Sequence, residues 1–160
     1  SAGGSGMTQE QKRGRSISMT TDELDAFLTG EHTCRLATVD ANGQPHVSPV
    51  WFVWDGECVW VNSIVKSQRW TDVMRNPLVG LTVDAGTAYF ELRGVEITGR
   101  AEAVGDVPRA ATGPDERVEL AETAFGNKYA GGTFMPDGRH AWLKITPAKI
   151  ASWDFRKLPS

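Results

Sequence analysis

Short strand-like runs, separated by turn signals at fairly regular spacing, restrict the fold of this chain more than any other feature. Six or seven such runs are rich in β-branched and aromatic residues, and three short helical stretches interrupt them. Short strands at this spacing are typical of all-β sandwiches and barrels, whereas a parallel sheet needs a helical connection between consecutive strands. We therefore expect mainly β structure with a few short helices, closed as an antiparallel barrel.

Local signals place the turns and an edge within this pattern. The expected strands lie at 32–39, 45–54, 57–62, 78–84, 88–94 and 95–104, with two final pieces at 139–147 and 149–155. Asn42-Gly43 is the strongest short hairpin signal and joins the first two strands. Pro49 lies inside the second strand and cannot donate to a ladder, so that point must be an edge, a bulge or a split. Gly99 predicts a bend or bulge in the sixth strand.

Three short helices are predicted around the strands. Thr20 and Glu23 form a capping-box pattern, and apolar residues then follow at helical spacing until Gly30, the expected C′ residue. A second, amphipathic helix is expected over 67–75 and is stopped by the proline that follows it. The third helix lies within 113–132.

The length of 160 residues is typical of one domain, which we place at residues 20–160. Residues 1–19 are expected to comprise an expression remnant, "SAGGSG", followed by a polar N-terminal arm that is either flexible or ordered against a partner subunit. The arm lacks the apolar stretch of a signal peptide, and no run approaches the ~20 residues that a membrane span needs. We therefore expect a cytoplasmic protein without a membrane span.

Charge and the usual ligand residues exclude several classes of function. Lys and Arg number 17 against 20 Asp and Glu, a net charge of −3, so no nucleic-acid partner is expected. Cys34 and Cys58 form no Cys-x-x-Cys motif and are predicted to be buried thiols. His32, His46 and His140 are far apart in the chain and match no metal-ligand spacing, so no metal site is expected.

The sharpest functional signal is "VNSIVKSQRW", residues 61–70, where a strand passes into the second helix. If that helix begins near Ser67, this residue caps it and the first-turn N–H groups point outward unpaired. Lys66 and Arg69 are three residues apart, which places both cations on one side of the helix terminus. With the amide donors of Gln68 they make an anion site suited to a phosphate. The alternative is a capped, solvated helix start with incidental charges.

Two further patterns have both a functional and a structural interpretation. The strand "PHVSPVWF", 45–52, could form a wall for a flat ring, or it could be an ordinary edge strand. The six tryptophans could form the floor of a binding site for a ring system, or they could pack in the core and at a subunit interface. On these residues alone the structural interpretation is favoured in both cases. A phosphate site without a protein nucleophile or metal nevertheless indicates that a cofactor carries the reaction.

The order of these features resembles the split β-barrel, flavin-binding family of pyridoxamine 5′-phosphate oxidase-like proteins. Within it, the chain looks most like the branch of flavin/deazaflavin oxidoreductases that use coenzyme F420. Four blocks across about residues 20–155 carry the resemblance: "TCRLATVDANGQPHVSPVWFVWDG", "VNSIVKSQRWTDVMRNPLVGLTV", "EITGRAEAV" and "RHAWLKITPAKIASWDF". The resemblance implies a split antiparallel Greek-key β-barrel of the FMN-binding type, assembled as a homodimer with two sites at the interface.

The same resemblance assigns roles to particular residues. Positions 66–69 are implied to hold the cofactor phosphate, and positions 48–51 to lie along the isoalloxazine or deazaflavin ring through backbone contacts. Positions 62 and 63 would face the ribityl chain or the phosphate, while Trp153 would come from the second subunit or line the dimer seam. The implied cofactor-binding residues are Ser48, Pro49, Val50, Trp51, Asn62, Ser63, Lys66, Ser67, Gln68, Arg69 and Trp153.

We therefore expect an oxidoreductase that transfers a hydride from reduced F420 to a small unsaturated or conjugated organic acceptor, with no catalytic residue of the protein assigned. FMN is the close alternative, because one phosphate cradle could serve either molecule. F420 also carries an acidic tail, for which the arm cations Lys12, Arg13 and Arg15 are candidates. Alternatives of other classes are a non-catalytic carrier of a flavin, deazaflavin or haem-like ligand, and an oligonucleotide-binding barrel, against which the acidic balance weighs.

Overall fold

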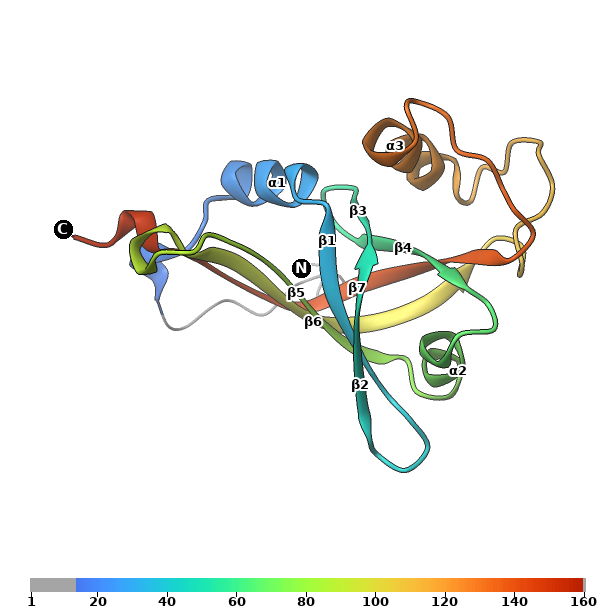
Figure 1. Ribbon diagram of the computed structural model, residues 1–160, viewed down its shortest axis with the longest axis horizontal. Coiled ribbons are helices and arrows are strands. Elements are labelled where there is room, and N and C mark those ends of the chain that lie inside the picture. The colour runs from blue at the N-terminus through green and yellow to red at the C-terminus, as the bar shows by residue number, and fades with distance from the viewer. Residues whose placement is uncertain (1–13, 160) are drawn as a thin grey trace, which may run out of the picture.

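The strands of the protein form one antiparallel sheet in the computed structural model, which describes residues 14–159 (Figure 1). In chain order they are β1 (Thr33–Val39), β2 (Pro45–Trp51), β3 (Val53–Trp54), β4 (Val59–Ile64), β5 (Leu78–Ala85), β6 (Arg93–Val104) and β7 (His140–Asp154). The helices are α1 (Thr21–Gly30), α2 (Gln68–Arg75) and α3 (Glu119–Tyr129), with 3-10 turns η1 (Arg15–Ile17), η2 (Tyr89–Glu91) and η3 (Phe155–Lys157). The predicted mainly β class with short helices is confirmed.

The sheet curls until its two edges meet at Phe52. Its strand order is β2-β1-β5-β6-β7-β4-β3, so β2 and β3 are at opposite edges, yet Phe52 alone separates them in the chain. One residue can join opposite edges only if the sheet wraps round on itself, which is the geometry of a split barrel. Pro49 lies in β2, which pairs with β1 alone in the described part of the chain. The prediction that this proline marks an edge is confirmed.

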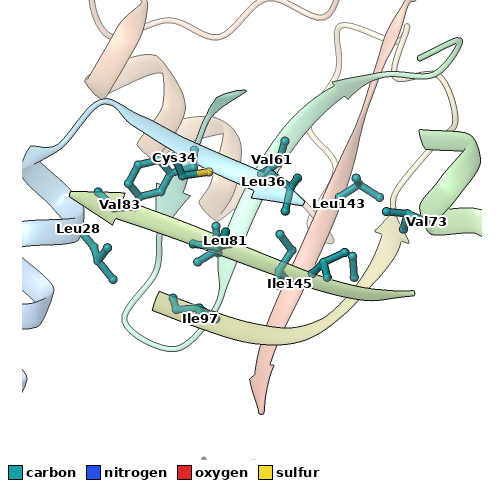
Figure 2. Close-up of a cluster of buried hydrophobic side chains, with 14 of the residues drawn as sticks. Leu28, Cys34, Leu36, Val61, Val73, Leu81, Val83, Ile97, Leu143 and Ile145 are labelled. Carbon is teal, nitrogen blue, oxygen red and sulfur yellow. The ribbon is translucent and has the colours of Figure 1, made fainter. Parts of the chain in front are cut away.

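The inside of the curled sheet is filled by one large apolar cluster. Side chains from β1, β4, β5, β6 and β7 point toward one another, and Leu28 of α1 and Val73 of α2 close the cluster at its two ends (Figure 2). Cys34 lies in this cluster as a free thiol, and its burial raises its pKa to about 12. The prediction of buried thiols is confirmed for Cys34 and for Cys58.

A second apolar cluster lies on the outer side of β4 and β7 and holds α3. Side chains alternate along a strand, so Val61 faces the core while Trp60 faces outward. Trp60 and Trp142 of β7, whose rings are in edge-on contact, pack against Val118 and Ala121, at the start of α3. This packing positions α3 and the loop that follows it on one side of the end of β4, with α2 on the other (Figure 1).

Several local predictions are confirmed. The Thr20 hydroxyl accepts the backbone N–H of Glu23 at 3.2 Å, and the Glu23 carboxylate accepts the backbone N–H of Thr20 at 2.8 Å, a complete capping box. Gly43 adopts a φ of 81° in the turn between β1 and β2. The register of β6 and β7 shifts between Thr98 and Gly99, where the predicted bulge lies.

Two local predictions are wrong. The expected strand at 88–94 begins as the 3-10 turn η2, because the aromatic side chains there pack on η3 rather than in a sheet: the ring of Tyr89 lies 5.0 Å from that of Phe155. Gly30 is the last helical residue of α1 and not a left-handed C′ residue, since the chain continues directly into extended backbone at Glu31.

Two boundaries also differ from the predictions. The third helix begins at Glu119 rather than near 113, because Asp115 accepts the backbone N–H of Arg117 at 3.0 Å and folds the preceding residues into a turn. The two final strand pieces form the single strand β7, which accommodates Pro147 by placing it opposite Gly99 at the bulge. A Cβ at Gly99 would lie 2.2 Å from a backbone oxygen, so this register requires glycine.

The described range includes the end of the N-terminal arm. Residues 14–19 contain η1, while the expected expression remnant and arm positions 7–13 lie outside the described residues. Within 14–159, no helix has the length and apolar character that crossing a bilayer requires.

Candidate cofactor site

A cavity of about 660 Å³ lies where β4 ends, between α2 and the loop after α3. Side chains from β2, β4 and α2 form one part of its wall, and α3 with the following loop forms the other. Its lining residues are Val50, Trp51, Asn62, Ile64, Arg69, Phe125, Ala130, Thr133, Phe134, Met135, Asp137 and His140.

Arg69 supplies the cavity with a half-buried positive charge. Its Nε donates to the hydroxyl of Ser63 at 3.2 Å and its Nη1 to the hydroxyl of Ser48 at 2.9 Å. A guanidinium has five N–H donors, so three stay uncommitted, and no carboxylate contacts Arg69 among residues 14–159. Burial lowers the pKa of Arg69, yet an arginine stays charged at neutral pH. A fixed cation without a counter-ion is suited to binding an anion.

Asn62 presents the cavity with an unpaired acceptor. Its side-chain oxygen Oδ1 is buried and has no hydrogen-bond partner, and no other buried side-chain N or O atom of the described residues is in this state. A buried acceptor left unpaired costs about 1–3 kcal/mol. A ligand that donates an N–H or O–H group to this oxygen would remove that cost.

Aromatic side chains form the wall that α3 contributes. The half-exposed ring of Trp51 is stacked on that of Tyr129, with centroids 4.4 Å apart and planes inclined by 5°. Phe125 lies 6.0 Å from Trp51 and 5.6 Å from Phe134, which continues the wall into the loop. The cavity is therefore flat-sided and apolar along this wall, and polar near Arg69.

Lys128 and Tyr129 tie α3 to the barrel at Phe52. The Lys128 ammonium donates to the backbone carbonyls of Phe52 and Leu28 at 3.1 and 3.2 Å and lies 3.9 Å from the centre of the Phe52 ring. The Tyr129 hydroxyl accepts the backbone N–H of Phe52 at 3.2 Å and donates to the carbonyl of His32 at 2.6 Å. Burial lowers the pKa of Lys128 to about 8 and raises that of Tyr129 to about 12. These bonds fix the aromatic wall relative to the sheet edges.

An aspartate and a histidine are paired on the cavity wall. The Nδ1 atom of His140 lies 2.6 Å from Oδ2 of Asp137. Both residues line the cavity, Asp137 from the loop and His140 from the first position of β7. No group of three or more His, Cys, Asp or Glu that could hold a metal ion occurs within the described range.

The cavity gathers many of the residues that the sequence predicted. Four of them line it directly, and two serines contact it through their hydrogen bonds to the guanidinium of Arg69. These six predicted residues are Ser48, Val50, Trp51, Asn62, Ser63 and Arg69.

The other residues of the predicted phosphate cradle, at positions 66–68, do not face the cavity. Ser67 caps α2 as predicted, because its hydroxyl oxygen accepts a first-turn backbone N–H at 3.1 Å. Gln68 donates to the buried carboxylate of Asp72 at 2.7 Å. Lys66 is exposed beside the entrance of α2 and does not line the cavity. Arg69 is therefore the residue of this segment that faces the cavity.

Pro49 and Trp153 lie away from the cavity. Pro49 is paired with Arg35 of β1. Trp153 lies at the opposite end of β7 from His140, packed so closely on β6 that a Cβ at Gly94 would lie 2.5 Å from its ring. Within one chain Trp153 does not reach the cavity, and its contribution from a second subunit stays a prediction.

The arm cations are not at this cavity within the described residues. Arg15 lines a different cavity of about 370 Å³, together with residues of α1 and the end of β7. Lys12 and Arg13 lie outside the described range.

Sequence reasoning missed the wall formed by α3 and its loop. The predicted third helix carried no role, although Phe125 and Tyr129 are four residues apart, a spacing that places both rings on one helix face. Asp137 and His140 were not connected, because the histidines were tested only for metal-ligand spacing. An aspartate and a histidine three residues apart at the start of a strand are the sequence signal that could have predicted this pair.

The profile of the pyridoxamine 5′-phosphate oxidase family matches residues 20–154, well over half of the chain. The protein therefore belongs to the pyridoxamine 5′-phosphate oxidase family, and its sheet is the split β-barrel of that family. None of the curated protein sequences gives a significant match to the chain.

Solved structures with the same fold cover proteins of different kinds. The conserved hypothetical protein Rv2991 from Mycobacterium tuberculosis is 29% identical, with a TM-score of 0.78 over 95% of each chain. A structure described as an F420 reductase is 23% identical, with a TM-score of 0.59 over 79% of this chain and 94% of its own. The haem storage protein HutZ from Vibrio cholerae is 21% identical, with a TM-score of 0.62 over 79% and 88%. At such identities the last two show the fold alone.

Proposed function

We propose that the protein is an oxidoreductase that binds coenzyme F420 in this cavity and passes a hydride from its reduced form to a small unsaturated or conjugated organic acceptor. The observation that carries the proposal is the half-buried guanidinium of Arg69, which has three uncommitted donors and no carboxylate partner among the described residues. Family membership supports a flavin-like ligand, and a structure described as an F420 reductase has the same fold.

The residues of the cavity fit a phosphate-bearing ring cofactor. A charge-assisted hydrogen bond is worth about 1.5–3 kcal/mol, so the three free donors of Arg69 would dominate the binding of a phosphate. The unpaired Oδ1 of Asn62 would accept an N–H or hydroxyl group of the ligand. The cavity of about 660 Å³ is within the size that ligand pockets usually have, about 300–1,000 Å³.

The chain would bind and orient the reactants, since the cofactor supplies hydride transfer when bound. Ser48 and Ser63 would fix the position of the Arg69 guanidinium, and this guanidinium would hold the phosphate. Asn62 would set the orientation of the ligand, and the edge strand at Val50 would lie along it. The aromatic wall of α3 would exclude water and bring the acceptor close to the reacting face.

We also propose that the protein works as a homodimer. Large apolar side chains on and beside β2 and β5 are exposed in a single chain, including Val47 at 70% and Leu78 at 53%. Residues of β1, β5 and β6 line most of a further cavity of about 530 Å³, which is mainly apolar. A second copy covering this surface would bury it. Such an arrangement is also the one in which Trp153 of the partner subunit could complete the site.

FMN is the alternative ligand, because the same guanidinium would bind the phosphate of either cofactor. The decisive experiment is a titration of the purified protein with F420 and with FMN, following tryptophan fluorescence, for which Trp51 in the cavity wall is a reporter. We expect F420 to bind the more tightly. Tighter binding of FMN would overturn the choice of cofactor, and binding of neither would overturn the proposed site.

Turnover separates an enzyme from a non-catalytic carrier. Reduced cofactor is mixed with the protein and a panel of enones and quinones, and its oxidation is followed by absorbance. We expect at least one acceptor to be reduced at a rate proportional to protein concentration. Tight binding without oxidation of the cofactor by any acceptor would instead support a carrier.

A further inference from the structure

The carboxylate of Asp137 is fixed by three hydrogen bonds next to His140. Its Oδ1 accepts the backbone N–H groups of Arg139 and His140 at 2.8 and 3.1 Å, and its Oδ2 is paired with Nδ1 of His140 at 2.6 Å. Burial alone would raise the pKa of Asp137, but these donors outweigh it and the pKa is lowered. The carboxylate is therefore ionised at neutral pH.

An ionised carboxylate only accepts hydrogen bonds, so Nδ1 of His140 must carry the proton between the two residues. The other ring nitrogen, Nε2, makes no hydrogen bond to any described residue. The His140 side chain is 26% exposed and lines the cavity, so Nε2 is accessible both to a ligand and to protons from solvent. The Asp137 carboxylate therefore orients the His140 ring and leaves Nε2 as the nitrogen that can exchange a proton with a ligand.

We propose that His140 is the proton donor of this site and that Asp137 is its positioning residue. The inference rests on the proposed function, because reduction of a conjugated C=C bond needs a proton as well as a hydride. The hydride adds to one carbon of that bond, and the electron pair of the broken π bond takes the proton from Nε2 at the other carbon or at the conjugated oxygen. The reduced deazaflavin or flavin is oxidised by two electrons, and His140 becomes neutral until solvent protonates it again.

The charged groups around His140 are consistent with this role. Asp137 is its immediate partner, and the Arg139 guanidinium lies 3.7 Å from the same carboxylate oxygen. From α2, Arg69 lines the same cavity. A product that develops negative charge as it receives the hydride would be attracted by this cation and by the imidazolium.

The chain contains a matched control pair. His46 is paired with Asp40 at 3.0 Å near the β1–β2 turn, but through Nε2, and neither residue lines the cavity. Both pairs join an aspartate to a histidine near a strand end. A role that depends on the cavity belongs to His140 alone.

The first test is steady-state turnover of His140→Gln in the full-length protein. General acid catalysis contributes about 10²–10⁴-fold, so we expect kcat to fall about 100-fold while the cofactor dissociation constant stays within twofold. His46→Gln should leave both values unchanged. A fall in kcat of less than tenfold for His140→Gln would overturn the inference. If the wild type binds neither cofactor, the proposed function itself is wrong, and not only the proton donation by His140.

Two further readouts exclude a merely structural role. In His140→Ala, added imidazole should restore at least a tenth of wild-type turnover, and failure of rescue with intact cofactor binding would count against proton donation. In the cofactor-free protein, nitrogen NMR shifts should show the neutral His140 ring protonated at Nδ1, with that preference lost in Asp137→Asn. An Nε2-protonated ring in the wild type would contradict the proposed orientation.

Discussion

Two arginines of this protein, the buried Arg109 and the half-buried Arg69, are stabilised in opposite ways. Arg109 is 4% exposed and is paired with the carboxylate of Glu122 through two hydrogen bonds of 2.9 and 3.1 Å. The backbone carbonyls of Ala111 and Gly113 accept further N–H groups of the same guanidinium. The hydrogen-bonded Glu122 raises the pKa of Arg109. Arg69, in contrast, is held by two neutral hydroxyls, and burial lowers its pKa.

The difference separates a structural charge from a charge available to a ligand. The guanidinium of Arg109 is neutralised and four of its five donors are committed, so it ties the loop before α3 to the helix and, through Glu122, to Trp142, whose Nε1 also donates to Glu122. Arg69 is oriented but not neutralised, and it lines the cavity. The absence of a carboxylate among its described contacts, rather than its burial, is the reason that we propose a ligand-binding role for Arg69.

The largest expected effect is on stability, at Arg109. Arg109→Ala leaves the largely buried Glu122 carboxylate without its cation and with the hydrogen bond from Trp142 Nε1, so we expect the free energy of unfolding to fall by about 3–5 kcal/mol, measured by urea denaturation. The matched control is Arg117→Ala, because Arg117 makes its ion pairs on the exposed surface and its loss should leave the urea midpoint unchanged. Equal urea midpoints for Arg109→Ala and the wild type would contradict the structural role of Arg109.

The next largest effect is on ligand binding, at Arg69. Arg69→Ala should weaken cofactor binding about 100-fold, or about 2.7 kcal/mol, because the charge-assisted bonds to the phosphate are lost. Its stability should stay close to that of the wild type, since no buried carboxylate is left unpaired. The exposed Lys66 serves for comparison, and Lys66→Ala should weaken binding only about tenfold. Fluorescence titration measures both, and an unchanged affinity in Arg69→Ala would place the phosphate elsewhere.

A smaller effect is expected from the hydroxyls that orient Arg69. Ser48→Ala and Ser63→Ala each remove one hydrogen bond, worth about 1 kcal/mol, so each should weaken cofactor binding about fivefold. Arg69→Lys keeps the charge but loses both hydroxyl contacts in their present geometry, and its affinity should lie between those of Arg69→Ala and the wild type. If the serine variants bind as well as the wild type, orientation of Arg69 contributes nothing.

The smallest expected effect concerns Lys128, another half-buried cation without a carboxylate partner in the described contacts. Its pKa is lowered from 10.5 to about 8, so between these pH values the unfolded chain binds more protons than the folded one. Stability therefore rises with pH across this window. Urea denaturation of the wild type and of Lys128→Met at pH 7.5, 9 and 10.5 should show the difference between them shifting in favour of the wild type. A pH-independent difference would contradict this.

Much of the fold could be predicted because it is encoded locally. The capping box at Thr20, the turn at Asn42-Gly43 and the edge position of Pro49 each depend on the backbone chemistry of one or two residues, and all are confirmed. The strand predicted at 88–94 failed because β propensity does not distinguish aromatic residues in a sheet from those that pack on a distant turn.

The site could be predicted only in part, because its second wall depends on long-range packing. The junction at 61–70 revealed Arg69 and its neighbours, since a helix start after a strand is a local signal. Sequence spacing could not show that Ser48 would meet Arg69, or that α3 would stack Tyr129 on Trp51. These contacts form because the two sheet edges meet at Phe52. No single segment of the sequence encodes that meeting.

The most direct measurement of the central claim is a crystal structure of the protein soaked with F420, and in parallel with FMN. We expect the phosphate within hydrogen-bond distance of the Arg69 guanidinium and a ligand N–H or hydroxyl on Oδ1 of Asn62. Bound cofactor whose phosphate is remote from Arg69, or a cavity that stays empty in crystals of protein shown to bind the cofactor in solution, would contradict the account.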